Sequence, residues 1–172
     1  MDASRISLRP FKLSDADDLL KWFGDERVAK NTRWDAISSR EEALAHLEKV
    51  AIPNPWHYSI CLDDRSIGYV AFWQGTLPYD KYKANVGYAV GAEYWGQGIA
   101  TVAVKKGLCR VFQDFPKLAR VEAYTLVDNG RSQRLLQKLG FVNEGLLRKV
   151  FYYQGEVRDF LIFSFLSTDH IL

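Results

Sequence analysis

A glycine-punctuated segment, residues 91–101 (GAEYWGQGIAT), constrains the fold of this chain more than any other feature. It lies between a predicted strand at residues 84–90 and a predicted helix at residues 98–112. The first amides of a helix have no intrahelical acceptor and lie at the positive end of the helix dipole. A loop that leads into a helix in this way favours an anion, most naturally a phosphate.

The residue types in the segment indicate how the anion would be held. Gly96 and Gly98 lack a Cβ, so a pyrophosphate can approach the main chain closely, and either glycine can adopt a positive φ. The segment holds no lysine or arginine. Main-chain amides, rather than a cation, are therefore expected to bind the phosphates.

Two widespread phosphate-binding motifs do not fit this segment. A P-loop requires Gly-Lys-Ser/Thr after the first glycine and four further residues, but Gln97 and Gly98 stand where the lysine and the hydroxyl should be. The dinucleotide-binding fingerprint requires a third glycine where Thr101 stands, within an early βαβ unit. This loop follows half of the chain, so neither nucleoside triphosphate nor dinucleotide chemistry is supported.

Two segments together resemble motifs of the GNAT superfamily of N-acetyltransferases. Residues 95–100 (WGQGIA) resemble its acyl-coenzyme A loop, Gln/Arg-x-x-Gly-x-Gly/Ala, with Trp95 in place of the usual Gln or Arg. Residues 129–141 (NGRSQRLLQKLGF) resemble its Asn-x-x-Ser…Leu-Gly-Phe segment. With residues 86–88 and 152–159, the resemblance extends along the chain and points to the ribosomal-protein (Rim-type) branch.

Apolar periodicity and capping residues predict the elements in order. We expect a first strand around residues 6–11, a helix capped by Ser14, a helix opened by a capping box at residues 39–42, strands at 57–62, 66–73 and 84–90, a helix at 98–112, a strand at 120–126, a helix following Asn129, and strands at 146–153 and 156–166. This order predicts an α/β fold with about four helices around one mixed, mostly antiparallel twisted sheet. Residues 1–172 are expected to form a single GNAT-like domain.

The resemblance also implies where the co-substrate binds. In this superfamily two parallel central strands splay apart, here residues 86–90 and 121–126, and the pantetheine arm satisfies their unpaired backbone groups as a pseudo-strand. The thioester then lies between the strands, and the amine arrives from the opposite face. The expected acetyl-CoA contacts are Tyr88, Ala89, Val90, Trp95, Gly96, Gln97, Gly98, Ile99, Ala100, Thr101, Asn129, Ser132 and Leu135.

Acetyl transfer to an amine needs a neutral amine, a stabilised oxyanion and a proton for the departing thiolate. The resemblance assigns that proton to Ser132, although a serine in the first turn can also simply cap its helix. Glu122 is the carboxylate of the two central strands and hence a candidate base. The alternative is that Glu122 is a sheet carboxylate paired with a neighbouring side chain. Asn85 and Tyr88 occupy the strand where many relatives carry a glutamate, so we expect the amine to lose its proton through water or before binding.

The acceptor is harder to assign than the donor. Trp34 and Trp73 are expected to border the acceptor side. Asp159 could bind the substrate amine, or could instead pair with Arg158 or Arg148. The sequence leaves open whether the acceptor is a protein N-terminus or a small amine.

Composition excludes several other classes of protein. At 172 residues, with 48% apolar residues, the chain suits one compact domain. Its net charge of +2 comes from interspersed charges, so neither nucleic acid nor a membrane is an expected partner. Two cysteines and the lack of a signal-peptide core predict a cytoplasmic protein. The spacing of His46, His57 and His170 predicts no metal site, and we expect a monomer or weak homodimer.

These observations predict an acetyl-CoA-dependent N-acetyltransferase that acts on a primary amine by direct attack in a ternary complex. The alternative is a catalytically silent acyl-CoA-binding regulatory module, which the lack of an obvious base favours slightly. A protein-interaction domain whose glycine loop binds no cofactor is a third interpretation. Thiol release from acetyl-CoA in the presence of amines, and stabilisation by coenzyme A, distinguish the three.

Overall fold

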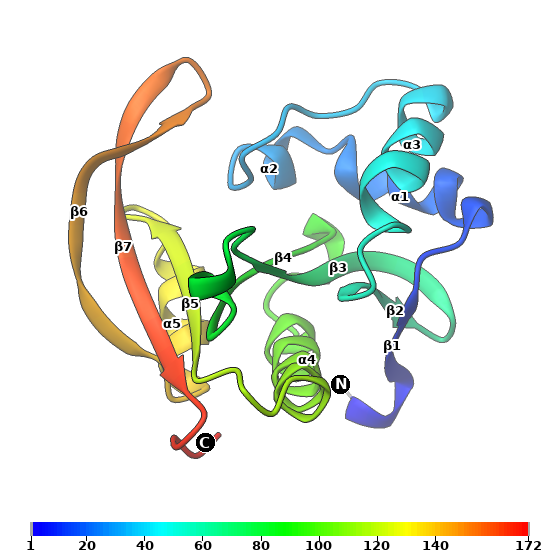
Figure 1. Ribbon diagram of the computed structural model, residues 1–172. Coiled ribbons are helices and arrows are strands. Elements are labelled where there is room, and N and C mark those ends of the chain that lie inside the picture. The colour runs from blue at the N-terminus through cyan, green and yellow to red at the C-terminus, as the bar shows by residue number, and fades with distance from the viewer. Residues whose placement is uncertain (1, 172) are drawn as a thin grey trace. The chain divides into compact units, whose positions relative to one another are not determined.

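The computed structural model describes residues 2–171 and contains a mixed seven-stranded sheet in the order β1-β2-β3-β4-β5-β7-β6 (Figure 1). The strands are β1 (Ile6–Pro10), β2 (His57–Leu62), β3 (Arg65–Gln74), β4 (Lys83–Val90), β5 (Arg120–Leu126), β6 (Val142–Tyr153) and β7 (Glu156–Leu166). The helices are α1 (Ala16–Phe23), α2 (Glu26–Ala29), α3 (Arg40–His46), α4 (Ile99–Asp114) and α5 (Gly130–Lys138). The predicted α/β fold with a mixed, mostly antiparallel sheet is confirmed.

The chain divides into two compact units. The first contains the residues up to 71 together with 88–107, and the second contains 72–87 together with the residues from 108 on. Strands β3 and β4 and helix α4 each run from one unit into the other.

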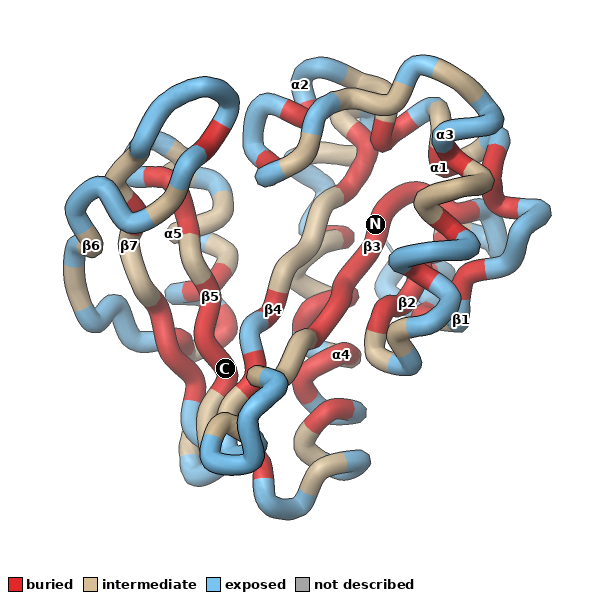
Figure 2. The backbone as a smooth tube through the Cα atoms, turned by 45° about the horizontal axis from the view of Figure 1, so that its top comes forward, coloured by how far each residue is buried: buried red, intermediate tan, exposed pale blue. Residues whose placement is uncertain are grey.

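The first unit is built on the antiparallel strands β1, β2 and β3. Most of β2 and β3 is buried, as Figure 2 shows. Helices α1, α2 and α3 contribute the remaining apolar side chains of this core, which include Leu19, Val28 and Ala43. On α1, Leu19 lies on the buried side of the helix and charged residues lie on the opposite side, so this helix has a clear core-facing stripe.

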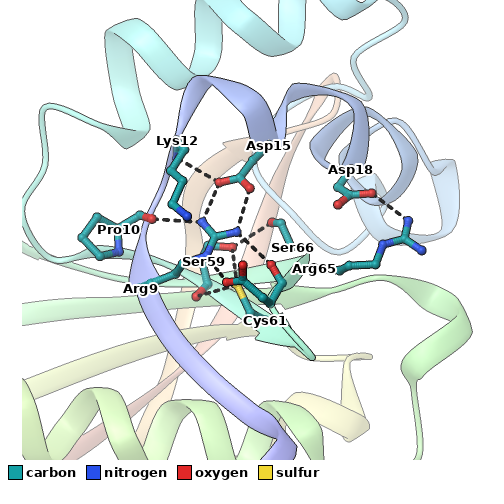
Figure 3. Close-up of polar contacts among 10 residues, drawn as sticks. Arg9, Pro10, Lys12, Asp15, Asp18, Ser59, Cys61, Arg65 and Ser66 are labelled. Atoms are coloured by element: carbon teal, nitrogen blue, oxygen red, sulfur yellow. Dashed lines mark hydrogen bonds and ion pairs between the residues drawn. The ribbon is translucent and has the colours of Figure 1, made fainter.

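The helix predicted to begin at Ser14 begins differently. Residues 13–15 form a 3-10 turn, and the buried carboxylate of Asp15, rather than Ser14, accepts the Lys12 amide at 2.9 Å. The same carboxylate accepts two 2.8 Å hydrogen bonds from the Arg9 guanidinium (Figure 3). Arg9 also donates to the side chain and the carbonyl of Asp64, each at 3.0 Å. The cap of this turn is therefore Asp15 rather than Ser14, and an ion pair with Arg9 holds it in place.

The second predicted helix start is confirmed, because the Ser39 hydroxyl accepts the Glu42 amide at 3.1 Å. The apolar spacing of Ala43, Leu44, Leu47 and Val50 predicts one buried face for this helix, but after α3 the chain continues as a π-helical turn at residues 47–51. The extra residue per turn places Ala51 in the core, at 1% exposure, and leaves Val50 44% exposed. The prediction for Val50 is therefore wrong.

The second unit contains β5, β7 and β6 side by side, all antiparallel (Figure 1). Phe163 and Phe165 of β7, with Leu136 and Leu139 from α5 and its end, are almost fully buried in its core. Strand β6 begins at Val142 rather than at residue 146, and it continues past Gly145, whose φ of 144° falls in the range that favours glycine.

The parallel pair of strands is also in this unit. Within residues 2–171 the ladder joins β4 to β5 over three pairs, from Lys83 opposite Arg120 to Asn85 opposite Glu122. Both strands run on beyond it, to Val90 and Leu126. Both strands therefore continue past the residues that this ladder pairs.

Candidate functional site

The glycine loop is anchored at its start by the main chain. The Gly91 amide donates to the Ile67 carbonyl of β3 at 2.8 Å, which fixes the point where β4 ends. A 3-10 turn follows, in which Tyr94 donates to Gly91 at 2.9 Å and Trp95 donates to Ala92 at 3.3 Å. The first half of the loop is thus a hydrogen-bonded turn.

The second half of the loop has open space beside its glycines and leads into the first amides of α4. Gly96 and Gly98 have φ of 77° and 79°, and a Cβ built on either would meet nothing within 4 Å. Residues 96–98 are exposed. The first hydrogen bond of α4 runs from Val102 to the Gly98 carbonyl at 3.2 Å, so the amides of residues 98–101 are those that a helix leaves without an intrahelical acceptor. Gly98 has no side chain with which to cap them.

Trp95, which departs from the superfamily motif, has a specific contact. Its indole Nε1 donates to the carbonyl of Val90 at 2.7 Å, back across the 3-10 turn. Gln97 makes a similar return contact, from Nε2 to the Glu93 carbonyl at 3.2 Å. The sequence did not reveal either bond, because side chain to main chain contacts within a loop depend on its exact path.

The expected contacts on β4 fall near the start of this loop. Tyr88 and Ala89 are half-buried, whereas Val90 is buried. Gly68 of β3 lies so close to Ala89 that an added Cβ would be 2.3 Å from the Ala89 carbonyl oxygen. This glycine is needed for close approach of the two backbones.

The second motif forms the start of α5, in the second unit. The Asn129 side chain caps the helix by accepting the Ser132 amide at 3.2 Å. The N-cap of this helix is therefore Asn129, and Ser132, whose amide it holds, is half-buried in the first turn. Gln133 donates to the carbonyls of Leu126 and Val127 at 3.1 and 2.9 Å and fixes the turn that leads from β5. Leu135, one turn further along, is also half-buried.

Glu122 lies in an ionic network on β5. Val121, Ala123 and Thr125 alternate along β5 and are buried, and Glu122 is itself only 8% exposed. One of its carboxylate oxygens accepts from Arg120 at 2.8 Å, and the other accepts from the Tyr124 hydroxyl at 2.9 Å. The structure thus shows a paired sheet carboxylate, with both oxygens engaged.

The network extends to the neighbouring strands. Arg120 also pairs with Glu144 of β6, which accepts a 2.7 Å hydrogen bond from the Ser164 hydroxyl of β7. The guanidinium, followed by this hydroxyl, lowers the pKa of Glu144 to about 2. Arg120 is therefore held by two carboxylates and links three strands.

Trp34 lies in an aromatic cluster of the first unit. It stacks on Phe23, with ring centroids 5.4 Å apart, and approaches Tyr69 at 5.5 Å. His46 and His57 complete the cluster. Burial, followed by the neighbouring His46, lowers the pKa of His57 to about 4, so this imidazole is neutral near neutral pH. It is a core histidine, as expected.

The other two predicted acceptor residues belong to the second unit. Trp73 is half-buried near the end of β3. Asp159 lies where β6 bulges, and its carboxylate accepts the Lys149 amide at 2.7 Å, with Lys149 at a φ of 49°. Two shallow surface depressions share Asp159 in their lining. Arg158 pairs with other carboxylates, those of Asp128 and Glu156.

Among residues 2–171, no three histidine, cysteine or carboxylate side chains lie together in a group that could hold a metal ion. No helix in the described part of the chain has the length and apolar character needed to cross a membrane.

The chain is similar to known acetyltransferases. A family model described as an acetyltransferase (GNAT) domain matches residues 5–142. The N-acetyltransferase p20 of Bacillus licheniformis is 29% identical over 172 residues, which cover 96% of this chain and 95% of that protein. A ribosomal protein uS5-alanine N-acetyltransferase of Escherichia coli (strain K12) is 26% identical over 107 residues, covering 62% of this chain and 55% of that protein.

A solved structure extends the likeness to three dimensions. The microcin C7 self-immunity acetyltransferase MccE, in complex with acetyl-CoA and AMP, superposes with a TM-score of 0.82 at 25% identity, over 94% of this chain and 92% of that one. The family predicted from the two motifs is confirmed, and the uS5-alanine relative is consistent with the Rim-type branch. The chain therefore belongs to the GNAT family of acetyltransferases, enzymes that use acetyl-CoA as the acetyl donor.

Proposed function

We propose that this chain transfers the acetyl group of acetyl-CoA to a primary amine, with residues 96–101 binding the pyrophosphate of the donor. The observation that carries the proposal is the glycine-rich start of α4, where two positive-φ glycines leave open space beside the amides that have no intrahelical acceptor. Amides at a helix N-terminus bind phosphates because their dipoles all point toward the anion. We further propose that the whole chain acts as one catalytic domain.

Donor binding is completed by groups that the family motifs indicate. The pantetheine arm, a chain of amides, would pair with the backbone of Tyr88 and Ala89 on β4, beyond the end of the parallel ladder. The Val90 carbonyl already accepts the Trp95 indole, which leaves it one lone pair. Asn129 is occupied as a helix cap, so its role toward the donor is to hold the first turn of α5 in place.

Proton transfer in the proposed mechanism involves Ser132. Its amide is fixed by Asn129, and its hydroxyl is in the first turn of α5, where it would donate a proton to the departing thiolate. The developing oxyanion would be stabilised by main-chain amides beyond the ladder on β4. Attack by the amine is direct, because neither Cys61, which is buried, nor the exposed Cys109 belongs to a nucleophile motif.

No dedicated base is proposed for the amine. Both oxygens of Glu122 already accept hydrogen bonds, one from Arg120 and one from Tyr124, so the carboxylate is held within the sheet network. The amine would lose its proton to water, or before it binds. The rate kcat/KM should then rise with pH toward the pKa of the acceptor amine.

The acceptor is proposed to be a protein N-terminus or a small primary amine. The uS5-alanine relative supports the first, since its name specifies N-acetylation of an alanine of a ribosomal protein. Free thiols at Cys61 and Cys109 suit a reducing compartment, and we propose the cytoplasm.

The test is acetyl-CoA turnover with a panel of acceptors. Free thiol release from acetyl-CoA is measured with peptides that differ in their N-terminal residue, with small amines, and without acceptor. Acceptor-dependent release with matching acetylation by mass spectrometry is the expected result. Coenzyme A binding without release for any member of a broad panel would instead favour the regulatory module, and the absence of binding would refute the site.

A further inference from the structure

The glycine loop, residues 91–101, contains one segment that is held by hydrogen bonds and one that is rich in glycine. Residues 91–95 are held by a hydrogen-bonded turn, whereas residues 96–98 contain two glycines with positive φ and are exposed. Glycine loses more conformational freedom on ordering than any other residue. A loop of this kind binds an anion well only if it is ordered before the anion arrives, because the entropy of ordering otherwise opposes binding.

Trp95 is the last residue of the hydrogen-bonded turn, and Gly96 follows it directly. Its amide donates to Ala92, and its indole donates to Val90 at 2.7 Å. The next main-chain hydrogen bond described in this direction runs from Val102 to Gly98. The indole bond therefore spans five residues and joins the end of β4 to the residue next to Gly96.

The side chain is well suited to such a contact. An indole has one donor and no acceptor, so it binds a carbonyl in one orientation only. It also has two rotatable bonds, which means that fixing it costs less entropy than fixing a Gln or Arg, the residues usual at this position of the motif. The half-buried ring holds the bond away from bulk water.

We propose that Trp95 is a positioning residue for donor binding: its indole hydrogen bond to the Val90 carbonyl holds residues 96–98 in the conformation that accepts the pyrophosphate. Trp95 need not touch the donor to act in this way. The inference rests on the proposed function, because it assumes that the amides of this loop are the phosphate ligands.

The test compares Trp95→Phe with the wild-type protein. Phenylalanine keeps an aromatic ring and removes the indole donor, together with the area of the second ring, a loss of area that the control variant also makes. The dissociation constant for coenzyme A and the KM for acetyl-CoA should both rise about 5- to 10-fold, as for the loss of one neutral hydrogen bond, with kcat at saturating acetyl-CoA unchanged. Trp56→Phe, a half-buried tryptophan outside this loop, is the matched control and should leave both constants unchanged.

Three results would overturn the inference. One is wild-type coenzyme A affinity in a folded Trp95→Phe protein. Another is a loss of kcat without a change in KM, which would assign Trp95 to the chemical step. If the variant does not fold, the wild-type protein still gives an answer by nuclear magnetic resonance, since the Trp95 indole proton should exchange slowly with solvent in the free protein; rapid exchange contradicts the hydrogen bond.

The result is separable from a failure of the proposed function. If Gly98→Val abolishes coenzyme A binding while Trp95→Phe does not alter it, the loop binds the donor and only the role of Trp95 is wrong. If neither substitution affects binding, the phosphates are bound elsewhere and the proposed site itself fails.

Discussion

Helices α4 and α5 both follow a strand and a short turn, yet their N-termini are finished in opposite ways. At α5 the Asn129 side chain accepts the Ser132 amide, and Gln133 fixes the carbonyls of the preceding turn. At α4 the residue before the helix is Gly98, which has no side chain, and the surrounding space is open. A capped end satisfies its amides within the protein, whereas an uncapped end leaves them for a ligand.

This difference shows how stability and binding compete for the same groups. A cap contributes about 1 kcal/mol to the stability of a helix. An uncapped helix start forgoes that contribution in the free protein and recovers it when an anion binds. Each motif lies between a strand and the helix that follows it, but the two differ in whether a side chain caps the first amides of that helix.

The largest expected effect comes from filling the uncapped end. Gly98→Val places a branched Cβ beside the amides and imposes a φ of 79° on a residue that disfavours it. Coenzyme A affinity should fall about 100-fold or more, because two or more hydrogen bonds to a charged phosphate are lost, each worth about 1.5–3 kcal/mol. Isothermal titration calorimetry measures the change.

The chain offers a control that separates strain from blocking. Gly155, in the turn between β6 and β7, has a φ of 86° and equally open surroundings. Gly155→Val should cost comparable stability and leave coenzyme A affinity intact. Equal affinities for the two valine variants would show that α4 does not bind the donor.

Ser132→Ala should have the next largest effect. The substitution leaves the amide that Asn129 caps, so the helix start is preserved. We expect kcat to fall by roughly 100-fold, the range of a single general acid, with little change in acetyl-CoA affinity. Ser132→Thr, which keeps a hydroxyl, should retain more activity than the alanine variant. A wild-type kcat for Ser132→Ala would reduce the residue to packing.

Glu122→Gln tests whether the polar groups of β5 serve the fold rather than the reaction. We expect kcat/KM to fall by less than about 10-fold, and stability to fall by about 1–3 kcal/mol, because Arg120 and Tyr124 each lose part of a buried charged partner. Steady-state rates over a range of pH, together with urea denaturation, measure the two effects. A loss of several orders of magnitude with intact coenzyme A binding would make Glu122 the base.

The smallest effect is expected at the capped end. Asn129→Ala should lower the free energy of unfolding by about 1 kcal/mol, the usual value of an N-cap, and Asn129→Asp should restore most of it. Thermal or denaturant unfolding gives the difference. If the alanine variant lost coenzyme A affinity far more than stability, Asn129 would contact the donor directly, and the contrast between the two helix ends would be weaker than described.

Local patterns predicted most of the fold because they depend on nearby residues. The Ser39 cap and the positions of α4 and β5 follow from spacing alone. What spacing could not show are contacts made at a distance. Asp15 caps its turn while bound to Arg9, and the π-helical turn at residues 47–51 shifts the buried face by one residue.

The candidate site shows the same division. The two motifs are read directly from the sequence, and the positive φ values of Gly96 and Gly98 follow from the presence of glycine, which is a local property. The partners of Glu122 include Arg120, two residues away, but the full network depends on Glu144, which reaches this point through the pairing of β6 with β7. Helix α2, only four residues long, was missed because it has too few positions to show a period.

The Arg9 cluster has a consequence for how the first unit is kept folded. The bonds from Arg9 to Asp64 close a loop of 55 residues, and those to Asp15 close a loop of six. A disulfide of this span acts by restricting the unfolded chain, because the covalent bond persists there. The guanidinium bonds instead exist only in the folded state and join these segments there, beside a Cys61 thiol that forms no disulfide (Figure 3). The first unit is therefore tied together by a link that needs no oxidant to form and that no thiol reductant can open.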